Sequence, residues 1–325
     1  MIAVTGASGH LGGNLVRALL ERGERVRVLI HRDRRALEAL DVDFIQGDIQ
    51  HPDSLRRAFA GVKLVYHSAA RISITGDRNG LVHRTNVEGT RNVVEACLSS
   101  GVGRLIHFSS IHALSPYPAD GTVDEARALA LDEDVPAYDR SKARGEMEVR
   151  KGMARGLDAV IIIPTGVIGP HDYKPSHMGQ VLLDICRRRI PALIDGGYNW
   201  VDARDVASLA LAAGERGRSG ESYLAAGRWV HFREMARLIA KISGRPAPGF
   251  MTPMWLGRVA APLFVGWARL TGRRPLFTPE ALHALRNHRH VSHRKASEEL
   301  GYRPRPIEET IRETLEWFRE NGRLE

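Results

Sequence analysis

The sequence predicts an α/β protein whose main domain is a doubly wound parallel sheet with helices on both faces. Over the first 170 residues, short runs of β-branched residues alternate with amphipathic segments, as is typical of parallel strands joined by crossover helices. A glycine-rich turn directly follows the first of these runs. After Gly169 and Pro170 the alternation stops and proline, glycine and histidine become frequent, which predicts a second lobe of different architecture.

Each element is predicted from its local pattern. Strands are expected at residues 2–4, 25–30, 43–46, 64–67, 105–108 and 159–163, where apolar and β-branched residues are concentrated. Helices are expected at residues 11–22, 34–40, 54–60, 86–100 and 141–154, where apolar residues recur at helical spacing. Gly23 and Gly101 follow the first and fourth helices, as glycine commonly does at helix ends.

The same patterns predict two structural parts. Residues 1–169 are assigned to the sheet domain, and residues 200–213 are expected to return to it as a strand end and a helix. The remaining segments, 170–199 and 214–325, are assigned to a smaller, mainly helical lobe with helices at 232–243, 255–270 and 307–321. No flexible linker separates the parts, so we expect a ligand cleft between them and a substrate-binding role for the smaller lobe.

Composition limits the class of protein. A chain of 325 residues with 43% hydrophobic residues can form a sizeable core. Two cysteines, Cys97 and Cys186, cannot supply a disulfide framework, and the histidines between 283 and 293 have no cysteine or carboxylate at ligand spacing, so no metal is expected. The chain starts with strand residues, with no charged segment and apolar run before them, and we expect a cytoplasmic protein.

The apolar stretch at 251–270 is not expected to span a membrane, because it contains Arg258, Arg269 and two prolines. An amphipathic helix pair over a substrate pocket is the favoured interpretation, and weak peripheral membrane contact is the alternative. The net charge of +9 lies mainly in residues 214–325, which carry 20 basic and 12 acidic side chains. No nucleic-acid-binding motif accompanies this charge, so nucleic acid is not an expected partner and a solvated face is favoured.

The glycine-rich turn predicts a nucleotide site. Glycine is needed where the turn is tight, where the backbone approaches pyrophosphate and where the helix meets the strand. The free N–H groups and dipole of the following helix favour bound phosphates. We therefore expect a Rossmann domain whose cofactor phosphates contact Gly6, Ser8, Gly9, His10, Leu11 and Gly12.

The end of the second strand bears on the choice between NADP and NAD. A NAD site usually places an acidic residue there for the ribose 2′-hydroxyl. Here the strand ends in apolar residues followed by His31 and Arg32, and Asp33 comes one or two positions late. Because an arginine can pair with a 2′-phosphate, we favour NADP with His31 and Arg32 at the site. NAD remains the alternative, with Arg32 then an ordinary surface arginine.

Tyr138 and Lys142 are four residues apart, so both face the same side of a helix. Hydride transfer to a carbonyl needs a proton donor beside the oxygen, and a neighbouring ammonium should lower the pKa of the tyrosine. Ser109 and Ser110 follow the fifth strand and offer a hydroxyl to hold the substrate oxygen. Together with the glycine turn, these residues predict an oxidoreductase.

On these motifs the chain resembles the extended short-chain dehydrogenase/reductases of the NAD(P)-dependent epimerase/dehydratase superfamily. Within it, the sequence is most similar to the dihydroflavonol-reductase-like branch, which includes proteins described as hopanoid-associated sugar epimerases. The resemblance implies that Ser110 is the catalytic serine, with Ser109 as the fallback, beside Tyr138 and Lys142. It also implies cofactor contacts at Asp48, Ile49, Ala69, Ala70, Tyr138, Lys142, Pro164 and Val167. The family often pairs its long helices, which implies a homodimer.

Departures from the family pattern bear on the substrate. Sugar-nucleotide epimerases commonly carry arginine at the position of Ile163 and asparagine at that of Gly166, and Ser115 stands where a glycine is usual. These losses favour reduction of a ketone or aldehyde in a fairly hydrophobic small molecule. A sugar-nucleotide epimerase or dehydratase is the alternative, and a non-catalytic NADP sensor is the alternative from another class. Near the substrate we expect Arg71, His112 and Thr165.

Overall fold

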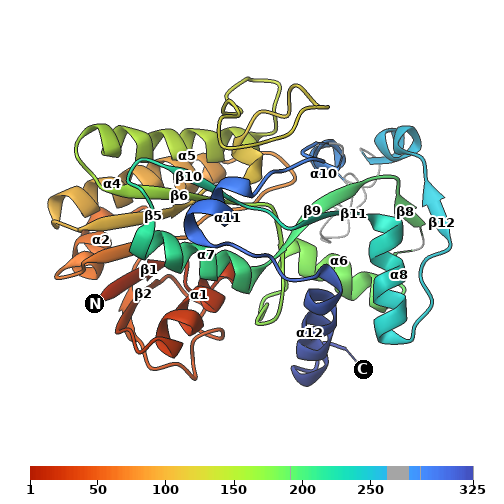
Figure 1. The fold of residues 1–325 in the computed structure, drawn as a ribbon, viewed down its shortest axis with the longest axis horizontal. Coiled ribbons are helices and arrows are strands. Elements are labelled where there is room, and N and C mark those ends of the chain that lie inside the picture. Colours follow the sequence, from red (N-terminus) through yellow and green to blue (C-terminus); the bar gives the residue numbers. More distant parts are fainter. Residues whose placement is uncertain (191, 262–277, 286, 325) are drawn as a thin grey trace.

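The computed structural model describes residues 1–190, 192–261, 278–285 and 287–324, which form a layered sheet domain beside a smaller lobe (Figure 1). The large sheet has seven strands in the order β10-β6-β5-β4-β1-β2-β3, and all neighbours are parallel. Its strands are β1 (Ile2–Thr5), β2 (Val26–Ile30), β3 (Asp43–Gln46), β4 (Leu64–His67), β5 (Arg104–Phe108), β6 (Ala159–Pro164) and β10 (Ser222–Ala225). The predicted doubly wound sheet is confirmed.

Helices cover both faces of the large sheet. One face packs against α1 (His10–Glu21), α7 (Ala203–Arg216) and α11 (Arg294–Leu300), and the other against α2 (Pro52–Phe59), α4 (Gly89–Ser99) and α5 (Ala137–Ala154). A strand covered on both sides needs apolar residues throughout, and all six residues of β6 are buried. Leu15 and Leu209 are buried on the first face, and Phe59 and Val93 on the second.

The order of the strands locates the ligand crevice. Strand β1 pairs with β2 on one side and with β4 on the other, so the direction in which strands are added reverses there. In open α/β sheets, ligands bind outside the carboxyl ends of the strands at such a reversal. The glycine turn that follows β1 and the serine pair that follows β5 both lie at this edge.

Several segments differ from the prediction, and α5 begins at Ala137, four residues before its predicted start. Residues 34–40 form turns and not a helix. Their main-chain hydrogen bonds join residues that are three apart, such as that from the N–H of Leu37 to the carbonyl of Arg34 at 2.7 Å. The helix expected from residue 86 begins earlier, with α3 (Leu81–His83) and a π-helical turn, η1 (Arg84–Glu88), before α4. Strand β10 lies in the range assigned to the smaller lobe, yet it extends the large sheet beside β6.

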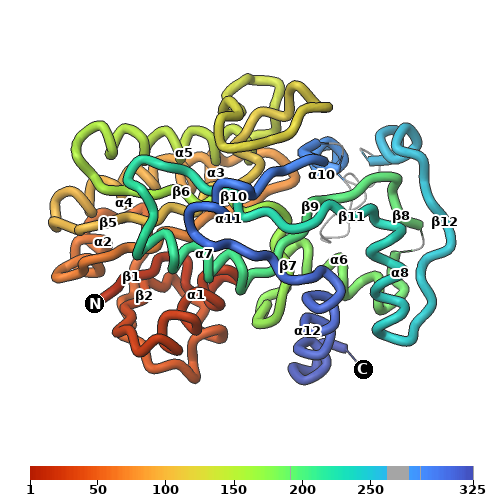
Figure 2. Tube along the Cα trace, viewed as in Figure 1, coloured from red at the N-terminus to blue at the C-terminus, as the bar shows by residue number. Residues whose placement is uncertain are grey.

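The smaller lobe combines helices with two small sheets. Its helices are α6 (His177–Cys186), α8 (Phe232–Ser243), α10 (Pro279–Ala284) and α12 (Ile307–Glu320). Strands β7 (Gly166–Ile168), β9 (Gly197–Asp202) and β11 (Arg228–His231) form one sheet, and β8 (Ala192–Ile194) pairs with β12 (Phe250–Thr252) in the other. Figure 2 shows the chain passing from α10 to α11 beside α7 and then returning to the lobe as α12.

The helices predicted at 232–243 and 307–321 correspond to α8 and α12. Of the helix pair predicted over 255–270, residues 254–261 are helical, and 262–270 lie outside the described residues. In the part of the chain that the structure describes, no helix is both long and apolar enough to cross a membrane.

Helix α5 lies unusually close to η1, and Gly145 allows this approach. A Cβ atom on Gly145 would lie 2.4 Å from the main-chain oxygen of Asn86, closer than real Cβ atoms come to a backbone. The substitution Gly145→Ala is therefore expected to lower the free energy of unfolding by about 1–3 kcal/mol, as overpacking typically does. Denaturant titration measures this change.

Gly249→Ala is the matched control, because nothing lies within 4 Å of a Cβ built there. Equal stability of the two variants would contradict the close approach of α5 and η1.

Candidate active site

Tyr138 and Lys142 lie one turn apart on α5, which begins at Ala137. The Lys142 ammonium donates a hydrogen bond over 2.7 Å to the carbonyl oxygen of Phe108, the last residue of β5. Ser110, two residues further along, is hydrogen-bonded through its side chain to Tyr138. The fold thus brings together the three residues that the sequence analysis proposed as catalytic.

Burial controls the protonation of this group. It raises the pKa of Tyr138 to about 12, although the hydrogen bond with Ser110 acts in the opposite direction. It also lowers the pKa of Lys142 to about 8, against the influence of the nearby Glu146 carboxylate. The sequence predicts a lowered pKa for Tyr138, because it identifies the neighbouring cation but not the depth of burial. In the structure the direction is reversed, and Tyr138 is protonated at neutral pH.

The two serines after β5 have different partners. The Ser109 hydroxyl donates a hydrogen bond of 2.7 Å to Glu146, whose side chain is fully buried and also accepts from Arg150 at 2.8 Å. Ser110 instead meets Tyr138, and its Oγ accepts the main-chain N–H of His112 at 3.2 Å. The geometry therefore places Ser110, and not Ser109, beside the tyrosine.

The glycine turn fits a dinucleotide. Gly6 has a φ of +73°, and a Cβ there would lie 2.4 Å from the main-chain nitrogen of Ala69, so β1 and β4 meet closely at this point. A Cβ on Gly12 would lie 2.2 Å from the Gly6 oxygen. Helix α1 starts after Gly9 with no side-chain cap, so its first N–H groups, from His10 and Leu11 onward, face the edge where phosphates are expected.

The residues expected to contact the adenosine ribose of the cofactor directly follow β2. Asp33 is hydrogen-bonded to Arg35, which lowers the pKa of its carboxyl. Arg32 is exposed and forms no ion pair within the described ranges. His31 lies nearby, with its Nε2 3.9 Å from the carboxylate of Asp48. Asp48 also accepts the main-chain N–H of Gln50 at 2.9 Å.

Asn86 is a site residue that the sequence analysis did not assign. Its side chain donates to the carbonyl of Arg71 at 3.0 Å and to the Ser141 hydroxyl at 2.9 Å, and it accepts the N–H of Arg71 at 2.8 Å. Asn86 thereby joins α5 to the segment after β4 that contains Ala69 and Ala70. The sequence Asn-Val-Glu-Gly-Thr at 86–90 is the available signal, but the sequence analysis assigned residues 86–100 only as a helix.

The residues predicted to lie near the substrate differ in their surroundings. The His112 ring meets that of Tyr138 edge-on, with centroids 5.7 Å apart. Arg71 is exposed. The Thr165 hydroxyl is turned to the main-chain oxygen of Ala225 at 3.4 Å. Three further residues were expected to contact the cofactor. Ile49 is buried and its carbonyl accepts a hydrogen bond from the Asn92 side chain, Pro164 ends β6, and Val167 lies in β7.

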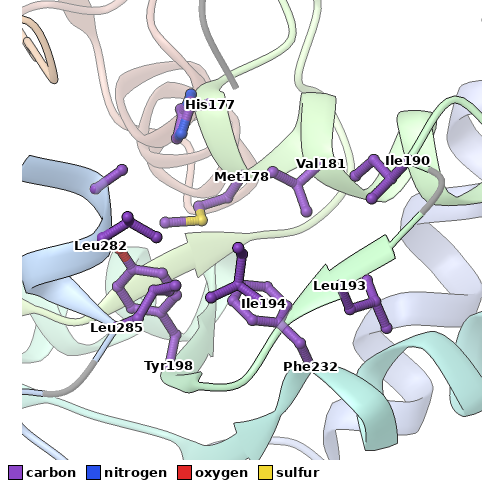
Figure 3. A pocket seen from close by; sticks show the side chains of 11 residues that line it. His177, Met178, Val181, Ile190, Leu193, Ile194, Tyr198, Phe232, Leu282 and Leu285 are labelled. Carbon is purple, nitrogen blue, oxygen red and sulfur yellow. The ribbon is translucent and has the colours of Figure 1, made fainter. Parts of the chain in front are cut away.

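An apolar pocket opens in the smaller lobe (Figure 3). It is partly open to solvent, and its walls come from α6, β8, β9, α10 and the start of α8. The side chains around it are mostly aliphatic or aromatic, and they include Met178, Val181, Leu193, Ile194, Phe232, Leu282 and Leu285. The sequence analysis proposed none of these, since their elements are far apart along the chain.

Tyr198 lines this pocket from β9. Burial raises its pKa, and so does the charge of Asp139, the residue next to Tyr138. Among the residues that the structure describes, no three histidine, cysteine, aspartate or glutamate side chains gather as a metal site.

The family model described as "NAD dependent epimerase/dehydratase family" matches residues 2–226. The chain belongs to this family. Membership makes it an NAD(P)-dependent oxidoreductase of the extended short-chain dehydrogenase/reductase type, and agrees with the turn, tyrosine and lysine described above.

Several known proteins resemble the chain over most of its length. "Sterol demethylase protein B" of Methylococcus capsulatus is 36% identical, with 99% of both chains covered. A "4-hydroxy-2-methyl-3-oxo-4-farnesyl-3,4-dihydroquinoline-1-oxide ketoreductase" of Stigmatella aurantiaca is 32% identical, over 92% of this chain and 90% of its own. The solved structure of gox2253 is 34% identical with a TM-score of 0.87, covering 100% and 99% of the two chains.

The partners of Ser109 yield a stability prediction. Ser109→Ala is expected to lower the free energy of unfolding by about 1–3 kcal/mol, because the buried Glu146 carboxylate would lose a donor. Ser99→Ala is the control, since the Ser99 hydroxyl bonds only to a helix carbonyl, and a change within about 0.5 kcal/mol is expected. Urea titration of both variants measures the difference, and an equally mild effect of Ser109→Ala would contradict this role.

Proposed function

We propose that the protein uses NADPH to reduce a ketone or aldehyde group in a largely apolar small molecule. The observation that carries the proposal is a protonated Tyr138 hydrogen-bonded to Ser110, in a protein whose smaller lobe holds a pocket with apolar walls. A proton donor is what a carbonyl oxygen requires as it becomes an alcohol.

In the proposed reaction the substrate oxygen is held by the hydroxyls of Ser110 and Tyr138. A reduced nicotinamide cofactor held at the glycine turn would supply the hydride that the carbonyl carbon accepts. Tyr138 gives its phenolic proton to the oxygen, so that the carbonyl becomes a secondary or primary alcohol and the tyrosine a phenolate. The hydrogen bond from Ser110 favours that phenolate, and solvent protons then restore the acid form.

The apolar pocket supports a substrate with a hydrocarbon body. Its walls offer few hydrogen-bonding groups, and burying polar sugar hydroxyls without partners would be unfavourable. Two relatives have names that fit such substrates, one a sterol-modifying protein and the other a ketoreductase of a farnesylated quinoline oxide. Their names support the same class for this chain.

NADP is favoured over NAD by the charges after β2. The Asp33 carboxylate is already engaged by Arg35, while Arg32 is exposed without an ion-pair partner in the described part of the chain. An arginine there suits a 2′-phosphate, with which it forms charge-assisted hydrogen bonds.

Tyr138→Phe is expected to lower kcat by about 10²–10⁴-fold, the usual contribution of a positioned acid, and to leave the Kd for NADPH unchanged. The assay follows NADPH absorbance and alcohol formation with panels of terpenoid, aromatic and alkyl ketones. Tyr117→Phe, at an exposed position, serves as the control. Interconversion of sugar nucleotides without net consumption of cofactor would instead identify an epimerase and reject the proposal.

Arg32→Ala is expected to raise the Kd for NADPH by about 10- to 100-fold, the cost of charge-assisted hydrogen bonds, and to leave the Kd for NADH nearly unchanged. Fluorescence titration with both cofactors measures this. Arg34→Ala is the matched control, because the Arg34 guanidinium lies over the Phe44 ring at 5.3 Å. Equal weakening of NADPH and NADH binding by Arg32→Ala would contradict NADP selectivity at this residue.

A further inference from the structure

We propose that His112, held by the carboxylate of Asp139, is a positioning residue that keeps the hydroxyls of Tyr138 and Ser110 in place relative to each other. The inference rests on the proposed function for the reaction it assists. It differs from the sequence-based expectation, in which His112 contacts the substrate.

His112 contacts both hydroxyl-bearing residues and the neighbour of one of them. Its main-chain N–H donates to Ser110 Oγ over 3.2 Å. Its Nδ1 lies 3.3 Å from Oδ1 of Asp139, which follows Tyr138 on α5. Its ring packs edge-on against the Tyr138 ring, with centroids 5.7 Å apart. One side chain therefore connects the turn after β5, η2 (Ile111–Ala113), with the start of α5.

The His112–Asp139 contact is one of three polar contacts along one face of α5. Asp139, Lys142 and Glu146 are spaced three and four residues apart, so they lie on one side of the helix. Lys142 bonds to the carbonyl of Phe108, and Glu146 accepts from Ser109. These two hydrogen bonds fix the part of α5 that follows Tyr138 against the end of β5. In the described residues, the His112–Asp139 pair is the corresponding ion pair at the first turn.

The first turn of α5 needs such a tie. Helix ends leave main-chain groups without intrahelical partners and tend to fray. The residue before α5 is Pro136, and no side chain caps the helix there. Tyr138 is the second residue of α5. Any fraying would displace its hydroxyl from Ser110, and misplacement of a reacting group by about 1 Å can cost on the order of 10²-fold in rate.

The surroundings favour a charged pair. Burial disfavours the imidazolium, but the charge of Asp139 and the hydrogen bond to it outweigh this, and the pKa of His112 is raised. The other titratable groups close by are Tyr138, Tyr198 on β9 and His288. Burial and Asp139 raise the pKa of both tyrosines, and burial together with His112 lowers that of His288 to about 4. These neighbours are neutral near pH 7, so the Asp139 carboxylate is the group that favours the imidazolium form of His112.

Kinetics of four variants test the proposal. His112→Ala and Asp139→Ala are each expected to lower kcat by about 10- to 100-fold, with KM and the Kd for NADPH within about twofold, because alignment is lost and binding is not. The double variant should be no slower than either single variant, since both remove one interaction. His112→Gln should recover most of kcat, because its amide can still donate to Asp139.

Hydrogen exchange of the whole protein supplies a readout that does not depend on turnover. Residues 137–141 are expected to exchange faster in His112→Ala than in the wild type, and His112→Gln should restore the protection. His83→Ala is the matched control, because His83 lies 3.8 Å from the Glu88 carboxylate in a partly exposed pair, and neither residue belongs to α5 or η2. Wild-type exchange and unchanged kcat are expected for it.

An unchanged kcat in His112→Ala, a rise in KM alone, or losses that multiply in the double variant would overturn the proposal. A rise in KM alone would identify His112 as a substrate contact. If the wild-type enzyme reduces no carbonyl compound, the proposed function fails. The exchange of residues 137–141 then decides the positioning role, and equal exchange in His112→Ala and wild type would overturn it.

Discussion

The tie between the polar face of α5 and the carboxyl end of β5 is the interaction on which the rest of the site depends. Lys142 and Glu146 are buried groups that must have partners, and the partners are the Phe108 carbonyl and the Ser109 hydroxyl. Because an unpartnered buried charge is costly, the helix has one favourable position along the strand. That position sets where Tyr138 stands relative to Ser110 and to the crevice at the sheet edge.

Burial then determines the chemistry of the tied residues. It shifts Tyr138 and Lys142 toward their neutral forms, so that the tyrosine is a proton donor and the lysine holds its charge less firmly than in water. The pocket of the smaller lobe adds walls with few polar groups. Hydrogen bonds to a substrate oxygen are stronger in such surroundings, which makes each correctly placed hydroxyl more effective.

Local patterns predicted much of the fold and part of the site. The alternation of strands and helices led to the parallel sheet, and the spacing of Tyr138 and Lys142 placed both on one helix face. The same reasoning was wrong about residues 34–40, where an apolar spacing that resembles a helix occurs in a connection of tight turns. It also did not anticipate β10, a four-residue strand whose place is decided by its pairing with β6.

The sequence by itself determined the fold class, the glycine turn and the residue types of the proton-transfer group, because each depends on neighbours within a few positions. Only the tertiary structure decided which serine meets Tyr138, since that depends on Glu146 engaging Ser109 from another element. It also decided the direction of the Tyr138 pKa shift, the walls of the pocket and the pairing of His112 with Asp139. Burial and contacts between distant segments have no local signature in the sequence.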